Sequence, residues 1–327
     1  MLSRRYLRVK TFQAIFAFRV SQNEDLVVGT KNLLHNLDKL HELLIYQLSF
    51  LIALSDFAEK RISENKKKHI PSEEDLNPNL RFVNNRISKL LKSNVNLQRE
   101  IENCRISWKD EEPMIRKLHS IILESKTYKS YLNSVDSFES DKSVWVKIIK
   151  NQLSHFDPIS FYYEDLNSIW IDDINIVNHL MIKFIKSFNE FDDEKKEIPE
   201  LFYDYNHTPV PEDKQFITDL FEMTVLAEDE NIELIRSKVQ NWELERIAIS
   251  DMIILEMGVT ELLKFPTIPI KVTLNEYIEL AKMFSTPNSH IFVNGVLDRL
   301  IAQLLKENKI HKTGRGLIDK SISRDRG

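Results

Sequence analysis

The segment IPIKVTLNEYIELAKMFSTPNSHIFVNGVLDRL, residues 268–300, decides the fold class of this chain. Its apolar residues recur every three or four positions, which is the spacing of one face of an α-helix. The pattern predicts a helix that buries Tyr277, Leu280 and Phe284, an interruption at STPNS, and a second helix from about Ser289 to Leu305.

Local signals predict where the first of these helices begins. Thr273 and Glu276 match the capping box T-x-x-E, and Val272 and Tyr277 are placed to form the hydrophobic staple around it. The sequence therefore predicts a helix start at this box.

The preceding segment, NWELERIAISDMIILEMGVTELL at 241–263, predicts another helix. Asn241 is its predicted N-cap, and the prolines of FPTIP end it after about Lys264. Asp251 lies at the edge of its apolar stripe, where a backbone amide or a cation is expected to hold the carboxylate. In the last helix Gly295 costs stability relative to alanine, and a tight helix crossing is the structural explanation we expect.

Helical spacing continues through most of the chain, without a sustained alternation that indicates a strand, so we predict an all-α fold. The stretch FDPISFYYEDLNSIW is dense in aromatic residues and is interpreted as packing material. The charged segment FDDEKKEIPELFYDYNHTPVPEDK is the best candidate domain boundary. Further helices are expected at about 31–60, 80–106, 113–132, 144–153 and 173–188.

Charge is unevenly distributed along the chain. Residues 1–20 sum to +5 and residues 306–327 to +4, whereas residues 21–305 sum to -14. Basic ends on an acidic body suggest a local contact with a polyanion, because the body itself repels one. Two solvated ends remain the alternative reading.

The N-terminal stretch SRRYLRVKTFQAIFAF, residues 3–18, combines cations with a core stripe. On a helix, Arg4, Arg5 and Arg8 share a sector with the following apolar residues, which are Phe12, Ile15 and Phe16. We expect the arginines to emerge beside the body with no core to bury them. They would form a cationic ledge for nucleic acid, with Lys10 and Tyr6 beside it.

Signals for catalysis or for a cofactor are missing from the sequence. Six glycines form no phosphate-binding loop, and Cys104 is the single cysteine. No two of the nine histidines stand at i and i+4, so HELLI at His41 is not a zincin motif. No apolar run approaches the roughly 20 residues of a membrane span. We therefore expect a binding protein without metal, cofactor, catalytic residue or membrane contact.

Three stretches resemble the NusB family of bacterial transcription antitermination factors: SRRYLRVKTFQAIFAFRVSQNED, the segment at 241–263, and the segment at 268–300 with its NE-x-x-ELAK and FVNGVLD elements. The resemblance implies two small helical bundles, and the cytoplasm is the default location expected from the lack of a predicted membrane span. The resemblance also implies binding of boxA-type single-stranded RNA in ribosomal RNA leader transcripts, together with the ribosomal protein NusE. That complex supports antitermination by RNA polymerase and ribosome assembly.

The resemblance also implies site residues and an organisation of the chain. Arg4, Arg5, Arg8 and Lys10 match the arginine-rich RNA-contacting start of the family. Asn288 stands where the family often has an acid, and it joins Phe292 on the RNA side, although Phe292 is equally explained as core. The expected parts are the N-terminal helix at 1–28, a helical insertion at 29–205, a NusB-like bundle at 206–305 and a flexible basic tail at 306–327.

Two other functions stay open on the sequence. The chain is alternatively a protein-interaction scaffold that has lost specific RNA binding, with the insertion as its docking surface. An RNA cytosine methyltransferase with a NusB-like domain needs a glycine-rich cofactor domain and a catalytic cysteine downstream. Cys104 precedes the NusB-like part, which argues against that enzyme.

Overall fold

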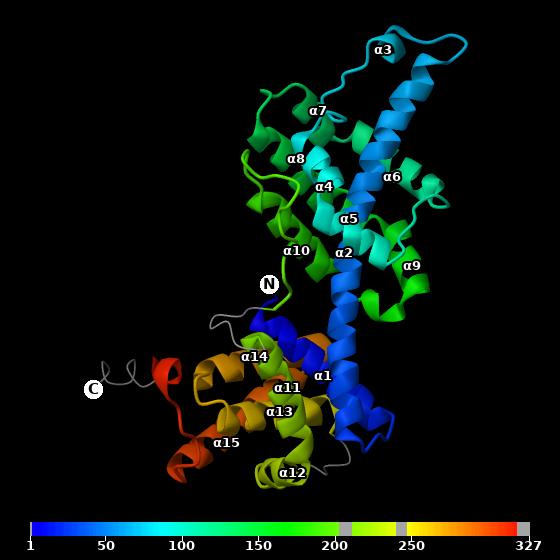
Figure 1. Cartoon of the computed structure of the whole chain (residues 1–327). Helices are drawn as coiled ribbons and strands as arrows, with labels where there is room; N and C mark the ends of the chain where they lie inside the picture. The colour runs from blue at the N-terminus through cyan, green and yellow to red at the C-terminus, as the bar shows by residue number, and fades with distance from the viewer. Residues whose placement is uncertain (1, 203–210, 240–246, 319–327) are drawn as a thin grey trace. The chain divides into compact units, whose positions relative to one another are not determined.

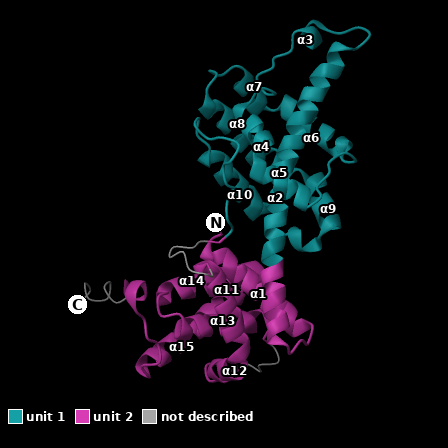
Figure 2. Cartoon of the chain, viewed as in Figure 1, with its two compact units in different colours: residues 1, 36–201 teal, residues 2–35, 202–327 magenta. Residues whose placement is uncertain are grey.

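The computed structural model describes residues 2–202, 211–239 and 247–318, and every regular element in these ranges is a helix (Figure 1). The all-α prediction is confirmed. The chain divides into two compact units (Figure 2). We call residues 36–201 the central unit, and residues 2–35 with 202–327 the terminal unit.

The terminal unit combines helices from the N-terminal part and from the last third of the sequence. Helix α1 packs on α11 and α13, and α13 packs on α14 and α15. Side chains such as Leu7, Ile15 and Tyr277 are fully buried between these helices. The helices are α1 (Arg4–Val20), the first part of α2 (Leu26–Lys66), α11 (Glu212–Leu226), α12 (Glu228–Arg236), α13 (Ile249–Lys264), α14 (Ile270–Phe284), α15 (Ser289–Lys306) and η4 (Gly314–Leu317).

The central unit is built around the remainder of α2 and an aromatic core. Tyr46 and Phe50 on α2 lie edge-on to Trp108, and Tyr163 and Trp170 are buried beside Tyr46. The aromatic stretch at 156–170 thus supplies packing, as its composition suggested. The other helices are α3 (Glu73–Leu76), α4 (Arg86–Ser93), α5 (Val95–Asn103), α6 (Glu112–Glu124), α7 (Lys126–Leu132), α8 (Phe138–Asn151), η1 (Leu153–His155), α9 (Asp157–Leu166), η2 (Ser168–Trp170) and α10 (Ile174–Ser187).

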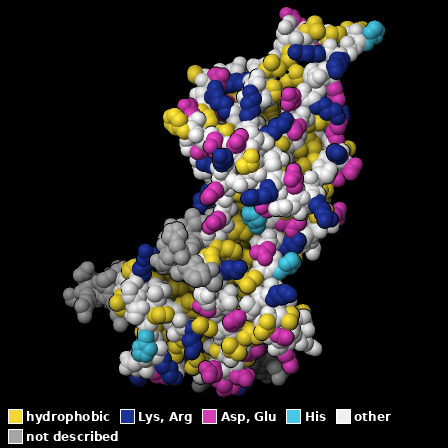
Figure 3. All heavy atoms as spheres, in the orientation of Figure 1, with side chains coloured by type: hydrophobic (Ala, Val, Ile, Leu, Met, Phe, Trp, Pro, Cys, Tyr) yellow, Lys and Arg dark blue, Asp and Glu magenta, His cyan; other side chains and the backbone are white. Residues whose placement is uncertain are grey.

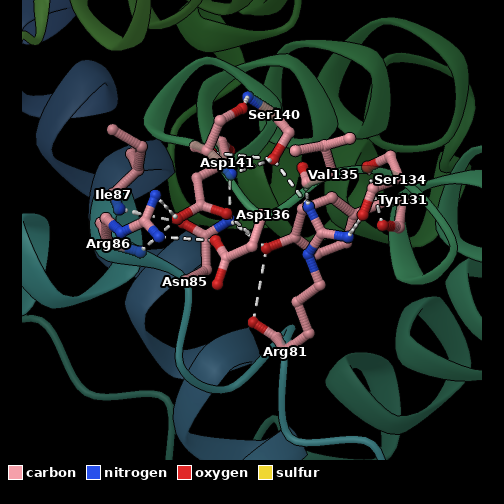
Figure 4. Close-up of polar contacts among 11 residues, drawn as sticks. Arg81, Asn85, Arg86, Ile87, Tyr131, Ser134, Val135, Asp136, Ser140 and Asp141 are labelled. Atoms are coloured by element: carbon pink, nitrogen blue, oxygen red, sulfur yellow. Dashed lines mark hydrogen bonds and ion pairs between the residues drawn. The ribbon is translucent and has the colours of Figure 1, made fainter.

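A buried polar network fastens the start of α4 to α7 and α8 (Figure 4). The Oδ1 atom of Asn85 accepts hydrogen bonds from Ile87 N at 2.9 Å and Ser88 N at 3.2 Å, so Asn85 is the N-cap of α4. Its Nδ2 donates to the Tyr131 hydroxyl, which donates to Asp141 Oδ1 at 2.6 Å. Because Asn85 is fully buried, these bonds satisfy polar groups that have no access to water.

Helix α2 is long and apolar enough to cross a membrane by length and composition alone. However, 61% of its most apolar 18-residue window is buried inside the fold. Leu40, Leu44 and Leu48 are completely buried. The apolar stripe of α2 therefore serves as core.

One predicted helix start is wrong, and the residue predicted to cap another helix lies outside the described residues. Helix α14 begins at Ile270, with Pro269 as N-cap, so Thr273 lies inside the helix, where its hydroxyl donates to Glu261 Oε1 at 2.8 Å. Helix α13 begins at Ile249, and Asn241 lies outside the described residues. The predicted end of α13 at Lys264 is confirmed.

The expected tight crossing at Gly295 is also wrong. A Cβ atom at Gly295 would meet only the Arg299 guanidinium, at 4.0 Å. The close approach lies at Gly258 of α13 instead, where a Cβ would come within 3.1 Å of Leu297 Cδ2 on α15. The two helices therefore meet across Gly258.

Candidate nucleic-acid interface

The basic N-terminal stretch forms the start of α1. Ser3 caps the helix, with its hydroxyl accepting a hydrogen bond from Tyr6 N at 3.2 Å. The first turn contains no acidic residue. The three arginines of the helix find acidic partners on other helices instead. Arg4 pairs with an acid on α11, Arg5 with one on α14 and Arg8 with one on α13.

Arg8 does not lie on an exposed ledge. Its side chain is 2% exposed and forms a two-pronged ion pair with Glu261 of α13, at 2.7 Å from Nε and 2.9 Å from Nη2. Burial alone lowers the pKa of Arg8, but the bonded carboxylate outweighs it and raises the pKa, so the guanidinium stays charged. The prediction that all three arginines lack a core to bury them is wrong for Arg8, because Glu261 and Tyr277 supply one.

Arg4 and Arg5 keep part of their surface in solvent. Arg4 is 41% exposed and donates from Nε to Asp213 at 2.9 Å, with its guanidinium 4.4 Å from the centre of the Phe216 ring. Arg5 is 49% exposed and donates from Nε and Nη2 to Glu276, both at 2.9 Å. An arginine has five N–H donors, so these bonds leave donors on both guanidinium groups.

Lys10 lies beside Tyr6, as expected, but it is buried. Lys10 is 4% exposed, and its ammonium group lies 5.5 Å from the centre of the half-buried Tyr6 ring. A direct contact of Lys10 with RNA is not supported by this burial. Its apolar stem instead contributes to the packing of α1.

The turn before α15 carries the other two predicted residues. Asn288 is exposed at the N-cap of α15, and Phe292 is half-buried one turn later. The turn is held by hydroxyl groups, since Ser289 Oγ donates to Asp251 Oδ2 at 2.8 Å and receives a bond from Ser285 at 2.9 Å. A hydroxyl, rather than the expected amide or cation, thus holds the buried Asp251 carboxylate.

Helix α14 connects the contact site of Arg5 to this turn. Glu276 of α14 binds Arg5, whereas Phe284, at the end of α14, stacks on Phe12 of α1 with ring centres 4.8 Å apart. Eight residues of helix, about 12 Å, separate these two contacts. The predicted residues therefore do not form one cluster. Arg5 binds the middle of α14 and Arg4 binds Asp213 on α11, whereas Asn288 follows the C-terminal end of α14.

A further ion pair of α1 was not singled out from the sequence. Arg19 donates to both carboxylate oxygens of Glu256 on α13, with Nη1 at 3.0 Å from Oε1, and contacts Glu228 at 3.3 Å. Burial raises the pKa of Glu256, although Arg19 opposes the shift. The detectable signal was the presence of Glu256 and Glu261, in addition to Asp251, within a mostly apolar helix.

Figure 3 shows basic and acidic side chains mixed over the visible face of the molecule. Within the described ranges, no group of three or more His, Cys, Asp or Glu residues is arranged to hold a metal ion. The exposed guanidinium groups and the polar turn are suited to an extended anionic strand such as single-stranded RNA.

Comparison with known proteins identifies the family. The NusB family model matches residues 176–302, from within α10 to within α15. The chain is 43% identical over 116 residues to transcription antitermination protein NusB of Salinibacter ruber, covering 36% of this chain and 72% of that protein. The proteins of the same name from Chloroherpeton thalassium and Koribacter versatilis are 40% and 38% identical, over 28% and 29% of this chain and 44% and 66% of their own lengths. The chain belongs to the NusB family of transcription antitermination proteins.

Proposed function

We propose that this chain binds boxA-type single-stranded RNA of ribosomal RNA leader transcripts together with NusE, and so supports rRNA transcription and ribosome assembly in the cytoplasm. It acts by binding, without catalysis or a cofactor. The observation that carries the proposal is the pair of half-exposed guanidinium groups of Arg4 and Arg5 at the start of α1. Membership of the NusB family supports it.

Arg4 and Arg5 are the residues that contact phosphate in this proposal. Each guanidinium is oriented by an acid, Asp213 or Glu276, and keeps N–H donors for a second anion. The acids also lower the net positive charge of the surface, which weakens binding to arbitrary polyanions. Recognition therefore depends on contacts beyond charge.

The buried groups position these contacts. The Arg8 pair with Glu261 fixes the start of α1 against α13, and Ser289 with Asp251 fixes the turn that presents Asn288. The exposed amide of Asn288 has both a donor and an acceptor for a base edge. The half-buried Phe292 ring supplies apolar surface beside it.

Titration of labelled boxA-like RNA and a scrambled RNA into the full chain, with and without purified NusE, tests the proposal. Preferential binding of the boxA-like RNA, strengthened by NusE, is the expected result. Equal affinity for both RNAs in both conditions contradicts specific RNA binding and favours the scaffold function.

A further inference from the structure

Two helices of the central unit form a local exception in its charge distribution. The unit contains 24 Lys and Arg against 28 Asp and Glu, so it is acidic overall. Residues 142–156 and 174–189, which cover most of α8 and all of α10, nevertheless contain no acidic residue. Their charged positions are lysines and histidines only.

Helices α8 and α10 pack against each other in opposite directions. Lys142, near the start of α8, donates to the carbonyl of Phe188 beyond the end of α10, at 3.1 Å. Ser154, just after α8, accepts a bond from Asn178, in the first half of α10, at 3.3 Å. The middle of one helix therefore lies level with the middle of the other.

Each of the two helices exposes one narrow cationic face. On α8 the residues Trp145, Ile148 and Ile149 are fully buried, while Lys147 and Lys150 are exposed at i and i+3. On α10 the buried stripe includes Val177, Met181 and Ile185. We call the exposed residues of these two faces the lysine strip, and they are Lys147, Lys150, His179, Lys183 and Lys186.

The lysines of the strip have no carboxylate partner among the described residues. Other lysines of the same unit do have one, and examples at 2.5 to 3.1 Å are Lys39 with Glu42, Lys60 with Glu112, Lys68 with Asp75 and Lys92 with Asp56. Like charges three residues apart on a helix repel each other. A strip of unpaired lysines on an acidic unit is therefore suited to an external anion.

We propose that the lysine strip binds the phosphate backbone of RNA outside the boxA element, independently of sequence. The inference rests on the proposed function, which brings a long transcript to this chain. Lysine ammonium groups bind phosphate as point charges without a fixed geometry, and the strip has one imidazole, that of His179, but no Phe, Tyr or Trp ring on which bases stack. Its contribution is therefore affinity and salt dependence, without base recognition.

The test changes Lys147, Lys150, Lys183 and Lys186 together to Gln in the full chain. The matched control changes Lys39, Lys60, Lys68 and Lys92 to Gln, which alters the net charge of the same unit equally. Binding is measured at several salt concentrations with two probes: a boxA-like RNA alone, and the same element followed by a long polyuridine segment. Circular dichroism and thermal unfolding establish that each variant is folded.

The strip variant is expected to bind the long RNA about tenfold more weakly, while its affinity for the short RNA stays within twofold. Its salt slope for the long RNA falls by about 2 to 3, since each phosphate contact contributes about 0.7 for a single strand. The control variant keeps the wild-type slope.

An equal loss of affinity for the long RNA in the strip and control variants, or no loss in either, overturns the proposal. An acidic protein surface is then the favoured partner of the strip. Failure of the proposed function is distinguishable, because it appears as loss of boxA preference in the wild-type chain itself.

Discussion

Arg8 of α1 and Glu261 of α13 form a fully buried, two-pronged ion pair, 253 residues apart in sequence. Glu261 also accepts hydrogen bonds from the Thr273 hydroxyl at 2.8 Å and the Tyr277 hydroxyl at 3.1 Å, both on α14. One carboxylate thus joins three helices. This arrangement assigns Arg8 to the architecture of the terminal unit and leaves Arg4 and Arg5 for the surface.

Replacing Arg8 with Ala is expected to destabilise the chain by about 3 to 5 kcal/mol, because it leaves the Glu261 carboxylate buried without its cation. Urea unfolding measures the change. The double variant Arg8→Met with Glu261→Gln removes both charges and keeps an acceptor for Thr273, so it is expected to be less destabilised than Arg8→Ala. A single variant as stable as the wild type contradicts the structural role of the pair.

Stability of the central unit is expected to decrease in mild acid through His119. Burial against Phe57 and the nearby Arg61 charge lower the pKa of His119 to about 4. The unfolded chain, with a histidine pKa of about 6.5, takes up the proton first, so stability is complete above pH about 6.5 and is lost as the pH falls toward about 4. The loss amounts to at most about 3 kcal/mol, at 1.36 kcal/mol per pKa unit.

Urea unfolding of wild type and His119→Phe at pH 7.5 and pH 5 measures this effect. The wild type is expected to lose more stability than the variant between the two conditions. Equal losses in both proteins show that His119 does not contribute.

Alanine at Gly295 is expected to stabilise the chain, by up to about 1 kcal/mol, since the site is helical and open. Alanine at Gly258 is expected to increase stability less, because its Cβ would lie only 3.1 Å from Leu297 Cδ2. Thermal unfolding of the two single variants compares them. A higher melting temperature for Gly258→Ala than for Gly295→Ala contradicts this order of stability.

Asn85 is expected to be the most sensitive single residue of the network in Figure 4. Asn85→Ala removes the cap of α4, worth about 1 kcal/mol, and leaves buried partners such as the Asp141 carbonyl without a donor. We expect a loss of about 2 to 4 kcal/mol in urea unfolding. Asn85→Asp, which keeps the cap acceptor but not the two Nδ2 donor bonds, separates the two contributions.

The sequence predicted the helices well because their apolar stripes are local information. The stripe of α14 identified Tyr277 and Leu280 as buried, although Phe284 is only half-buried, and the end of α13 followed from Pro266. The capping box at Thr273 failed because the helix already begins at Ile270, after Pro269, so Thr273 lies within it and its hydroxyl donates to Glu261. Gly295 was misread because helix crossings depend on which glycine faces a neighbour, and that neighbour is set by the tertiary fold.

The candidate interface was predictable only in part. The cationic start of α1 was visible, but the acids that pair with it, at Asp213, Glu261 and Glu276, lie more than 200 residues away. A helical wheel of α1 cannot distinguish the buried Arg8 from the exposed Arg5. The burial of Lys10 also follows from tertiary packing.

The most direct test of the account measures boxA-like RNA binding by the chain with Arg4 and Arg5 both changed to Ala, in the presence of NusE. The control changes Arg236 and Arg299, two exposed arginines outside the proposed interface, to Ala. We expect at least about tenfold weaker binding for the first variant, and a salt slope lower by about 1.4, from two phosphate contacts at about 0.7 each. Wild-type affinity and slope in that variant, with the fold intact, would contradict the assignment of the start of α1 as the RNA contact.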